Sequence, residues 1–178
     1  DRAASLADRA LTRAIFGRHP YGHPGIGDPE AVRATTVDEI RAFHGHGYQP
    51  GATTLVVAGD LDTAEGIALA EQAFGAWVPG PTNGTGLRPT PAPEPRGGVL
   101  VVARPGASQS ELRVGQVSAA RSTPDYHALL LWNAVLGGQF VSRLNLNLRQ
   151  EKGYTYGVRS GFDFRRDRGP FSIHTSVQ

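Results

Sequence analysis

The amino-acid sequence predicts an α+β fold in which an antiparallel sheet has helices packed on one face. Helical periodicity and strand-like alternation occupy separate runs of the chain. Two alternating runs near the C-terminus are joined by a short arginine-rich turn, as in a hairpin. The order of the runs is not that of βαβ crossovers, so an antiparallel sheet is expected rather than a parallel one.

The first part of the chain predicts two helices. Residues 1–17 are rich in alanine and carry apolar residues at helical spacing. Residues 17–30 hold so many prolines and glycines that regular structure is not expected there. Thr36 and Glu39 then form a capping box, which predicts a short helix to about His44.

A strand, a helix and a linker are predicted next. Residues 53–58 read TTLVVA, a β-branched run that is typical of a buried strand. Asp62 and Glu65 repeat the signature of a helix start, and Gly75 is the expected end of that helix. Residues 80–98 are rich in proline and glycine, which predicts a linker between two parts of the chain.

The last part begins with two strands and ends with two. A threonine, proline and aspartate at 123–125 predict the start of a helix, because they supply a cap, a first-turn proline and a favourably placed acid. Tyr154, Tyr156 and Val158 alternate with polar residues and are expected on one apolar face. The predicted elements are strands at 99–104 and 111–118, helices at 125–136 and 141–152, and strands at 154–164 and 171–177.

Composition excludes several classes of function. The 178 residues include no cysteine, so a disulfide framework, a thiolate zinc site and a thiol nucleophile are ruled out. The chain also has no methionine, so we expect a fragment or a processed form rather than a complete translation product. No apolar run has the length of a membrane span. The net charge is only +2, and the arginines at 165, 166 and 168 are more typical of a solvated turn than of a nucleic-acid site.

Two histidines raise the question of a metal. His19 and His23 are four residues apart, but prolines and glycines between them prevent the helix that would bring them together. A zinc site would need a third ligand, for which Asp28 or Glu30 are merely nearby. A loop held by hydrogen bonds explains these histidines more simply, so no metal ligand is predicted in this chain. No serine lies in a nucleophile elbow, and no carboxylate pair stands out.

Arg149 and Tyr156 are the remaining candidates, and each has two interpretations. Tyr156 belongs to an apolar face, so packing in the core accounts for it. Arg149 lies near the end of a helix, where a cation interacts favourably with the helix dipole, and Lys152 could share that role. Alternatively, both side chains project into a cleft and donate hydrogen bonds to a peptide carbonyl oxygen that becomes an oxyanion.

Two longer motifs bear on this choice. Residues 16–62 contain a His-Pro-Tyr-Gly loop, a threonine-capped helix, Tyr-x-Pro and a strand that ends in Gly-Asp. Residues 136–158 read LGGQFVSRLNLNLRQEKGYTYGV. Together these stretches resemble the pitrilysin/insulinase family of zinc metallopeptidases, which includes mitochondrial processing peptidase and insulin-degrading enzyme. One departure is Asn145, where many members carry an aromatic residue, and this weakens any expectation of a hydrophobic substrate pocket beside Arg149.

The resemblance implies homologous α+β domains of the processing-peptidase type that close on an unfolded peptide. In the family, one domain binds zinc through an inverted His-x-x-Glu-His motif, and another supplies an arginine and a tyrosine. Arg149 and Tyr156 match the latter pair, whereas the zinc motif is absent from this sequence. The chain therefore resembles the non-zinc, inactive peptidase domain. Residues 1–79 and 99–178 look like the C-terminal half of one family domain and the N-terminal half of the next.

The implied function is substrate binding and oxyanion stabilisation by Arg149 and Tyr156 in a zinc metalloendopeptidase, with this chain inactive by itself. Zinc is expected in the complete enzyme or on a partner subunit, and the substrate is a peptide or an unfolded protein. The alternatives are a non-catalytic scaffold or peptide-binding subunit and an unrelated α+β binding domain. The two halves could complete one another within a chain or swap in a homodimer. The composition indicates a bacterial source, without distinguishing cytoplasm from periplasm.

Overall fold

The computed structural model describes residues 2–80 and 97–178, which form two compact units. One unit contains residues 2–27 and 97–178, and the other contains residues 28–80. Residues 81–96, most of the predicted linker, lie outside the described residues. The first unit holds the sheet and the predicted site residues.

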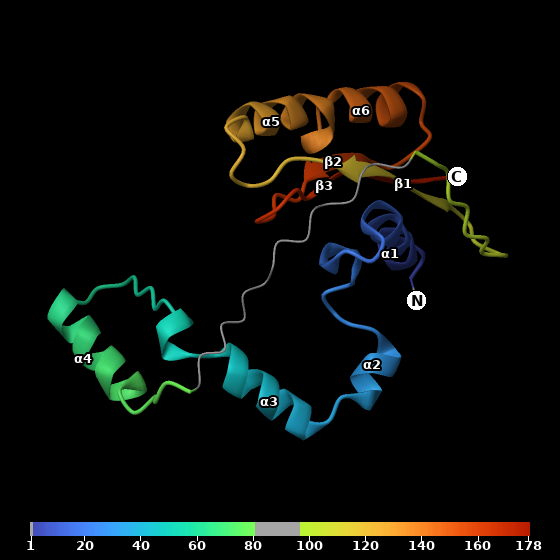
Figure 1. Ribbon diagram of the computed structural model, residues 1–178. Coiled ribbons are helices and arrows are strands. Elements are labelled where there is room, and N and C mark those ends of the chain that lie inside the picture. The colour runs from blue at the N-terminus through green and yellow to red at the C-terminus, as the bar shows by residue number, and fades with distance from the viewer. Residues whose placement is uncertain (1, 81–96) are drawn as a thin grey trace. The chain divides into compact units, whose positions relative to one another are not determined.

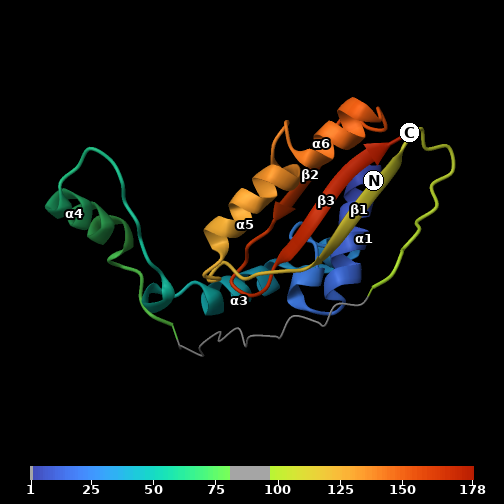
Figure 2. The same cartoon turned by 90° about the horizontal axis from the view of Figure 1, so that it is seen from above.

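The sheet has three antiparallel strands in the order β1-β3-β2 (Figure 2). They are β1 (Ser110–Val117), β2 (Val158–Phe162) and β3 (Pro170–Val177). The central strand β3 pairs with both neighbours, so that one residue of β3 often has a partner on each side. The predicted α+β class, the antiparallel sheet and the C-terminal hairpin are confirmed.

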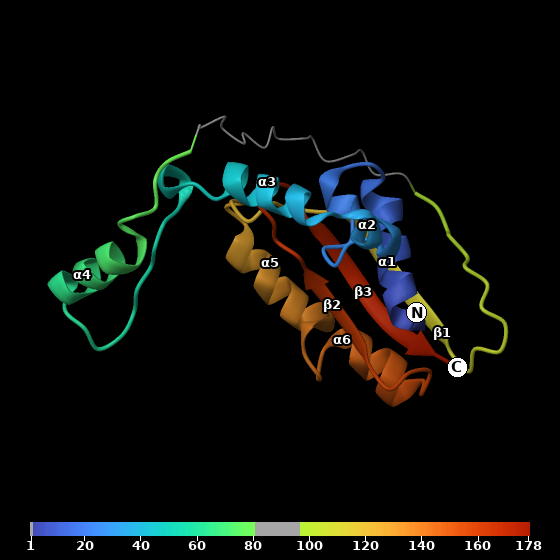
Figure 3. The same cartoon turned by 90° about the horizontal axis from the view of Figure 1, so that it is seen from below.

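Helices lie on both faces of this sheet (Figure 1). On one face are α5 (Tyr126–Asn133) and α6 (Arg143–Asn145), as the sequence predicts for this part of the chain. Each continues into a π-helical turn, η3 (Ala134–Gly138) and η4 (Leu146–Glu151). The opposite face carries α1 (Ala3–Phe16), which lies against β1 (Figure 3) and was not predicted to join this sheet.

A glycine allows α1 to approach β1 closely. A Cβ atom at Gly115 would lie 3.1 Å from side-chain carbons of both Leu11 and Ile15. Those two apolar residues belong to the helical stripe that predicted α1, so the stripe packs where the strand has no side chain. The helix end is buried as well, since only 1% of Phe16 is exposed.

The other face is packed with aromatic residues. The rings of Phe162 and Phe171, a cross-strand pair, lie 4.7 Å apart, and Trp132 of α5 lies 5.5 Å from Phe171. At Gly137 a Cβ atom would come within 2.5 Å of the Ser160 hydroxyl, so only glycine lets η3 pack directly on β2. This gives the Leu-Gly-Gly motif a packing role in the fold.

The second unit consists of short helices joined by extended chain. Its elements are α2 (Pro29–Ala34), α3 (Val37–Gly47), the 3₁₀ turn η2 (Pro50–Ala52) and α4 (Thr63–Phe74). The predicted capping box opens α3: the Thr36 amide donates to Glu39 at 2.7 Å, and hydrogen bonds from Thr36 lower the pKa of that carboxyl. Helix α2 was missed, although Asp28 caps it and a proline follows at its first position.

Two predicted strands are wrong. Residues 53–58 and 99–104 are extended, but neither pairs with a neighbour within the described parts of the chain. Their apolar side chains remain exposed: Val56 is 83% exposed and Val99 is 93% exposed. A β-branched run forms a strand only when another strand accepts its backbone hydrogen bonds, and composition does not supply that partner.

Within residues 2–80 and 97–178, no helix is both long enough and apolar enough to cross a bilayer.

Candidate functional site

Arg149 lies on η4 between two aromatic rings. Its guanidinium carbon is 4.2 Å from the ring centroid of Phe140 and 5.2 Å from that of Tyr156. Such cation–π contacts orient the guanidinium by its flat face and leave its N–H edge available. In residues 2–80 and 97–178, no protein oxygen accepts a hydrogen bond from this group. Phe140 was not singled out from the sequence, because nothing local indicated that it meets Arg149.

Tyr156 does not pack in the core, which corrects the packing interpretation of that residue. It is 91% exposed, because β2 begins only at Val158 and the alternation of 154–164 does not extend back to it. The preceding residues form a turn in which Thr155 accepts a hydrogen bond from the Gly157 amide at 3.1 Å. Thr175 of β3 donates to the Thr155 hydroxyl at 2.8 Å, so the turn that carries Tyr156 is tied to the sheet.

A groove of about 670 Å³ in the first unit contains both predicted site residues. One part of its lining surrounds the start of β2, where the side chains of Phe140, Arg149 and Tyr156 lie. Another part consists of polar side chains on the strands, which are Glu111, Arg113, Arg159, His174 and Ser176. The structure therefore brings Arg149 and Tyr156 together at an open groove with polar side chains on one part of its lining, which is a suitable place for an extended ligand.

The polar part of the groove is organised around Arg113. Its guanidinium donates to Asp8 of α1 at 2.6 Å and to Glu111 at 2.9 Å. Burial opposes the charge of Arg113, but these two carboxylates together raise its pKa. The Arg113 side chain is only 8% exposed, so this ion pair connects α1 to the sheet at the edge of the groove.

His174 of β3 pairs with Arg113 of β1 across the sheet. Its pKa is lowered, whereas that of Arg113 is raised. Burial is the first cause that lowers its pKa, and the positive charge of Arg113 is the second, whereas Asp8 at 3.5 Å acts against them. Arg159 pairs with His174 across β2 and β3, and the His174 ring contacts the Ser172 hydroxyl at 2.7 Å. The surroundings of the imidazole therefore disfavour its charged form and lower its pKa.

We expect the stability of this chain to fall as the pH drops below the ordinary histidine pKa of about 6.5. The folded-state pKa of His174 is the lower one, so in that window the unfolded chain binds more protons and unfolding becomes easier. Denaturant unfolding at about pH 7.5 and about pH 5.5 measures the change. His174→Asn should reduce it, whereas the same replacement of His127, exposed on α5, should not. If the free energy of unfolding depended on pH equally in His174→Asn and in the unmodified chain, His174 would not be the source of the pH dependence.

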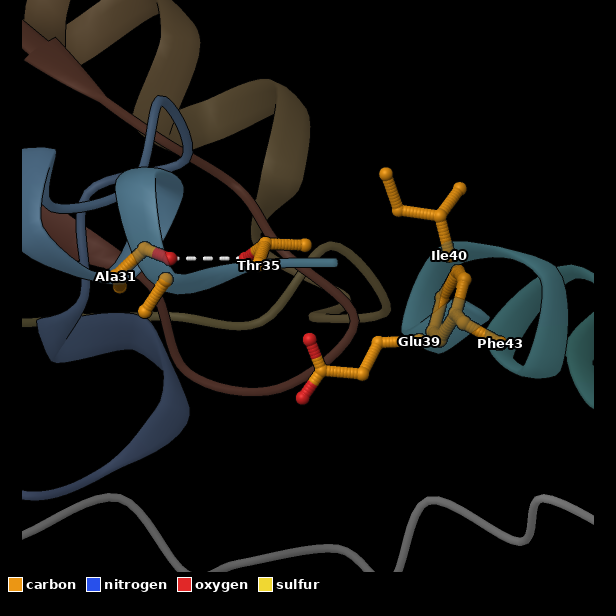
Figure 4. A pocket seen from close by; sticks show the side chains of 6 residues that line it. Ala31, Thr35, Glu39, Ile40 and Phe43 are labelled. Atoms are coloured by element: carbon orange, nitrogen blue, oxygen red, sulfur yellow. Dashed lines mark hydrogen bonds between the residues drawn. The ribbon is translucent and has the colours of Figure 1, made fainter. Parts of the chain in front are cut away.

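A second hollow, of about 390 Å³, lies in the unit of residues 28–80 (Figure 4). Its lining comprises Ala31, Ala34, Thr35, Glu39, Ile40 and Phe43. Its polar groups are already engaged, since Thr35 donates to the Ala31 carbonyl at 2.8 Å and Glu39 belongs to the capping box. It offers no convergent polar groups to a ligand and is not the candidate site.

The described residues contain no group of three histidine, aspartate or glutamate side chains able to hold a metal. His19 is buried, and its Nδ1 accepts the Tyr21 amide at 3.0 Å. The ring packs against Phe16 and Tyr21, and the Tyr21 hydroxyl accepts the Asp167 amide at 3.2 Å. The hydrogen-bonded loop predicted for these residues is therefore what the structure has.

Comparison with known proteins identifies the family. The sequence profile described as "Peptidase M16 inactive domain" matches residues 34–178. The chain belongs to this family. An uncharacterized zinc protease of Mycobacterium leprae is 31% identical over 99% of this chain and 39% of its own length. The predicted resemblance to zinc metallopeptidases of the insulinase type is thus confirmed.

Solved structures agree with the assignment. The peptidase M16 inactive domain from Pseudomonas fluorescens superposes with a TM-score of 0.89 at 33% identity, covering 99% of this chain and 42% of that one. A protease from Helicobacter pylori gives a TM-score of 0.78 at 21% identity, over 97% of this chain and 42% of that one, and shares the fold. This M16 chain spans about two fifths of the length of these relatives. Its division at residues 80–98 into halves of two family domains stays a prediction.

Proposed function

We propose that this chain is the non-zinc domain of a zinc metalloendopeptidase and that Arg149 and Tyr156 bind the substrate carbonyl and stabilise its developing negative charge. The observation that carries the proposal is the pairing, in one groove, of a guanidinium that has no hydrogen bond to residues 2–80 and 97–178 with a tyrosine that is 91% exposed. Packing in the core does not require this arrangement, because the tyrosine is almost fully exposed.

The chemistry of the two groups suits this role. A guanidinium carries a permanent charge and several N–H donors in one plane, and a phenol supplies one further donor. Donors that are already oriented in a groove stabilise an oxyanion without reorganisation, and this makes them effective in acyl-group chemistry. The Arg149 guanidinium carbon lies 4.2 Å from the Phe140 ring centroid and 5.2 Å from that of Tyr156, and these contacts support such orientation.

Zinc does not fit the residues described here, since they include no set of ligands for it. In this proposal the metal belongs to a companion domain, in the same full-length chain or on a partner subunit, where it supplies an activated water. The relative from Mycobacterium leprae carries the name of a zinc protease, which supports this division of labour. The residues of the present chain then bind and orient the peptide.

The proposal is tested by zinc analysis and peptide hydrolysis with three samples: the full-length protein, this 178-residue chain, and the chain mixed with the zinc-bearing part. We expect zinc and hydrolysis of an unstructured peptide in the first and third samples, with neither in the second. A chelator-treated sample provides the control. Stoichiometric zinc in the isolated chain would overturn the assignment, and a zinc-loaded full-length protein that cleaves no unstructured peptide would leave a scaffold function instead.

A further inference from the structure

We propose that Asn145 is a positioning residue that holds Tyr156 and the loop before α6 in place around Arg149. This inference rests on the proposed function of Arg149 and Tyr156. Asn145 departs from the aromatic residue expected by resemblance, and it is only 5% exposed. Its side chain is a buried amide in the lining of the groove, where a polar group requires partners.

The amide of Asn145 bonds to the backbone of β2 in both directions. Its Nδ2 donates to the Val158 carbonyl at 2.8 Å, and its Oδ1 accepts from the Val158 amide at 2.9 Å. The side chain thus forms the hydrogen bonds that a neighbouring strand would make at this position of the edge strand. Val158 is completely buried, so water cannot replace these bonds.

A third hydrogen bond extends the connection. Nδ2 also donates to the Gln139 carbonyl at 3.1 Å, and it lies 3.3 Å from the Ser142 hydroxyl. Gln139 directly precedes Phe140, whose ring lies against the Arg149 guanidinium. One amide therefore connects the loop that carries this ring with the strand that follows Tyr156.

Asn145 and its partner Val158 each lie close in the chain to one of the two proposed site residues. Asn145 lies four residues before Arg149, about one helical turn, on the helical run formed by α6 and η4. Val158 lies two residues after Tyr156. The bonds of Asn145 consequently set the spacing between the helical turn that carries the guanidinium and the start of β2, which directly follows the turn that carries the phenol. An aromatic side chain could fill this space but could not make these bonds.

A matched control exists in the same sheet. Asn133 of α5 also joins a helix to β2, donating to the Ser160 carbonyl at 3.1 Å and accepting from the Ser160 hydroxyl at 2.7 Å. It does not line the groove. Replacement of Asn133 by leucine removes a comparable link between helix and sheet but leaves the bonds from Asn145 to Gln139 and Val158 in place. It therefore reports the effect of losing a helix–sheet hydrogen bond outside those two segments.

The test measures peptide hydrolysis by the full-length protease, or by its complex with the zinc-bearing subunit, in a double-mutant cycle. Asn145→Leu should lower kcat by up to about a hundredfold, the loss expected when a reacting group moves by about 1 Å. In the Tyr156→Phe background the same change should cost clearly less than in the unmodified protein, because the phenol that Asn145 helps to position is already absent. Asn133→Leu should have additive, small effects in both backgrounds.

Two outcomes overturn the inference, and they differ from failure of the proposed function. If Tyr156→Phe lowers kcat but Asn145→Leu does not, or if the two losses are additive, Asn145 has no positioning role. If Tyr156→Phe itself has no effect, the proposed function fails first. Should Asn145→Leu not fold, Asn145→Ser is uncharged and smaller, cannot reach both Gln139 and Val158, and should give the same non-additivity.

Discussion

Replacement of Arg149 by alanine is expected to lower the turnover of the complete protease by about a hundred- to a thousandfold, the usual loss when one donor to an oxyanion is removed. The guanidinium lies between the rings of Phe140 and Tyr156, and no protein oxygen in the described parts of the chain occupies its N–H groups. Its charge is therefore available to the carbonyl oxygen as negative charge develops. Steady-state hydrolysis of an unstructured peptide measures the effect.

Lys152→Ala is the matched control for that result. Lys152 follows the end of η4 and could also interact with the helix dipole, but it does not line the groove. If Arg149 served only as a cation at a helix end, both variants would behave alike. Loss of the two cation–π contacts should cost about 0.5–1 kcal/mol each. A large loss of turnover with a small change in melting temperature would thus support the role of Arg149 in oxyanion stabilisation. Near-normal turnover of Arg149→Ala would contradict that role.

Tyr156→Phe is expected to lower turnover by a similar factor, about a hundredfold or more, because only the phenolic donor is removed. The phenylalanine ring can keep its place 5.2 Å from the Arg149 guanidinium carbon, so the geometry of that side chain is preserved. The free energy of unfolding should hardly change, since Tyr156 is 91% exposed and buries little surface. Peptide hydrolysis and denaturant unfolding of the same samples separate the two effects.

Tyr154 supplies the control for this variant. It lies two residues earlier, is 59% exposed and does not line the groove. Tyr154→Phe should retain the turnover of the unmodified protein. Equal losses of turnover in Tyr154→Phe and Tyr156→Phe would indicate a general disturbance of the turn. Unchanged turnover in both variants would show that catalysis does not depend on a phenol in this turn.

Local signals in the sequence predicted the elements that depend on near neighbours. The capping box at Thr36 and Glu39 opens α3, and Asp62 caps α4. The alternating run at 171–177 became β3, with pairing on both sides. In each case the deciding contacts join residues within one turn or follow from a period of two along the strand, so they can be read without knowing the fold.

Predictions failed where a distant partner was needed. Residues 53–58 have strand composition but no strand beside them in the described structure, and the same is true of 99–104. Tyr156 was placed on an apolar face because alternation was continued through a turn that Thr155 and Thr175 hold. The first paired residue of β2 is set by the pairing of β2 with β3, and β3 follows the arginine-rich turn in the chain.

The sequence by itself determined the family, the α+β class, most helix starts and the identity of the two candidate residues, because motifs, caps and periodicity are properties of neighbouring positions. Only the tertiary structure decided that Tyr156 is exposed, that Phe140 lies against Arg149, and that the unexpected Asn145 joins their segments. These facts depend on the register of β2 against β3 and on how η4 packs beside the sheet. Contacts between residues far apart in the chain follow from the folded arrangement as a whole, and no single stretch of sequence contains them.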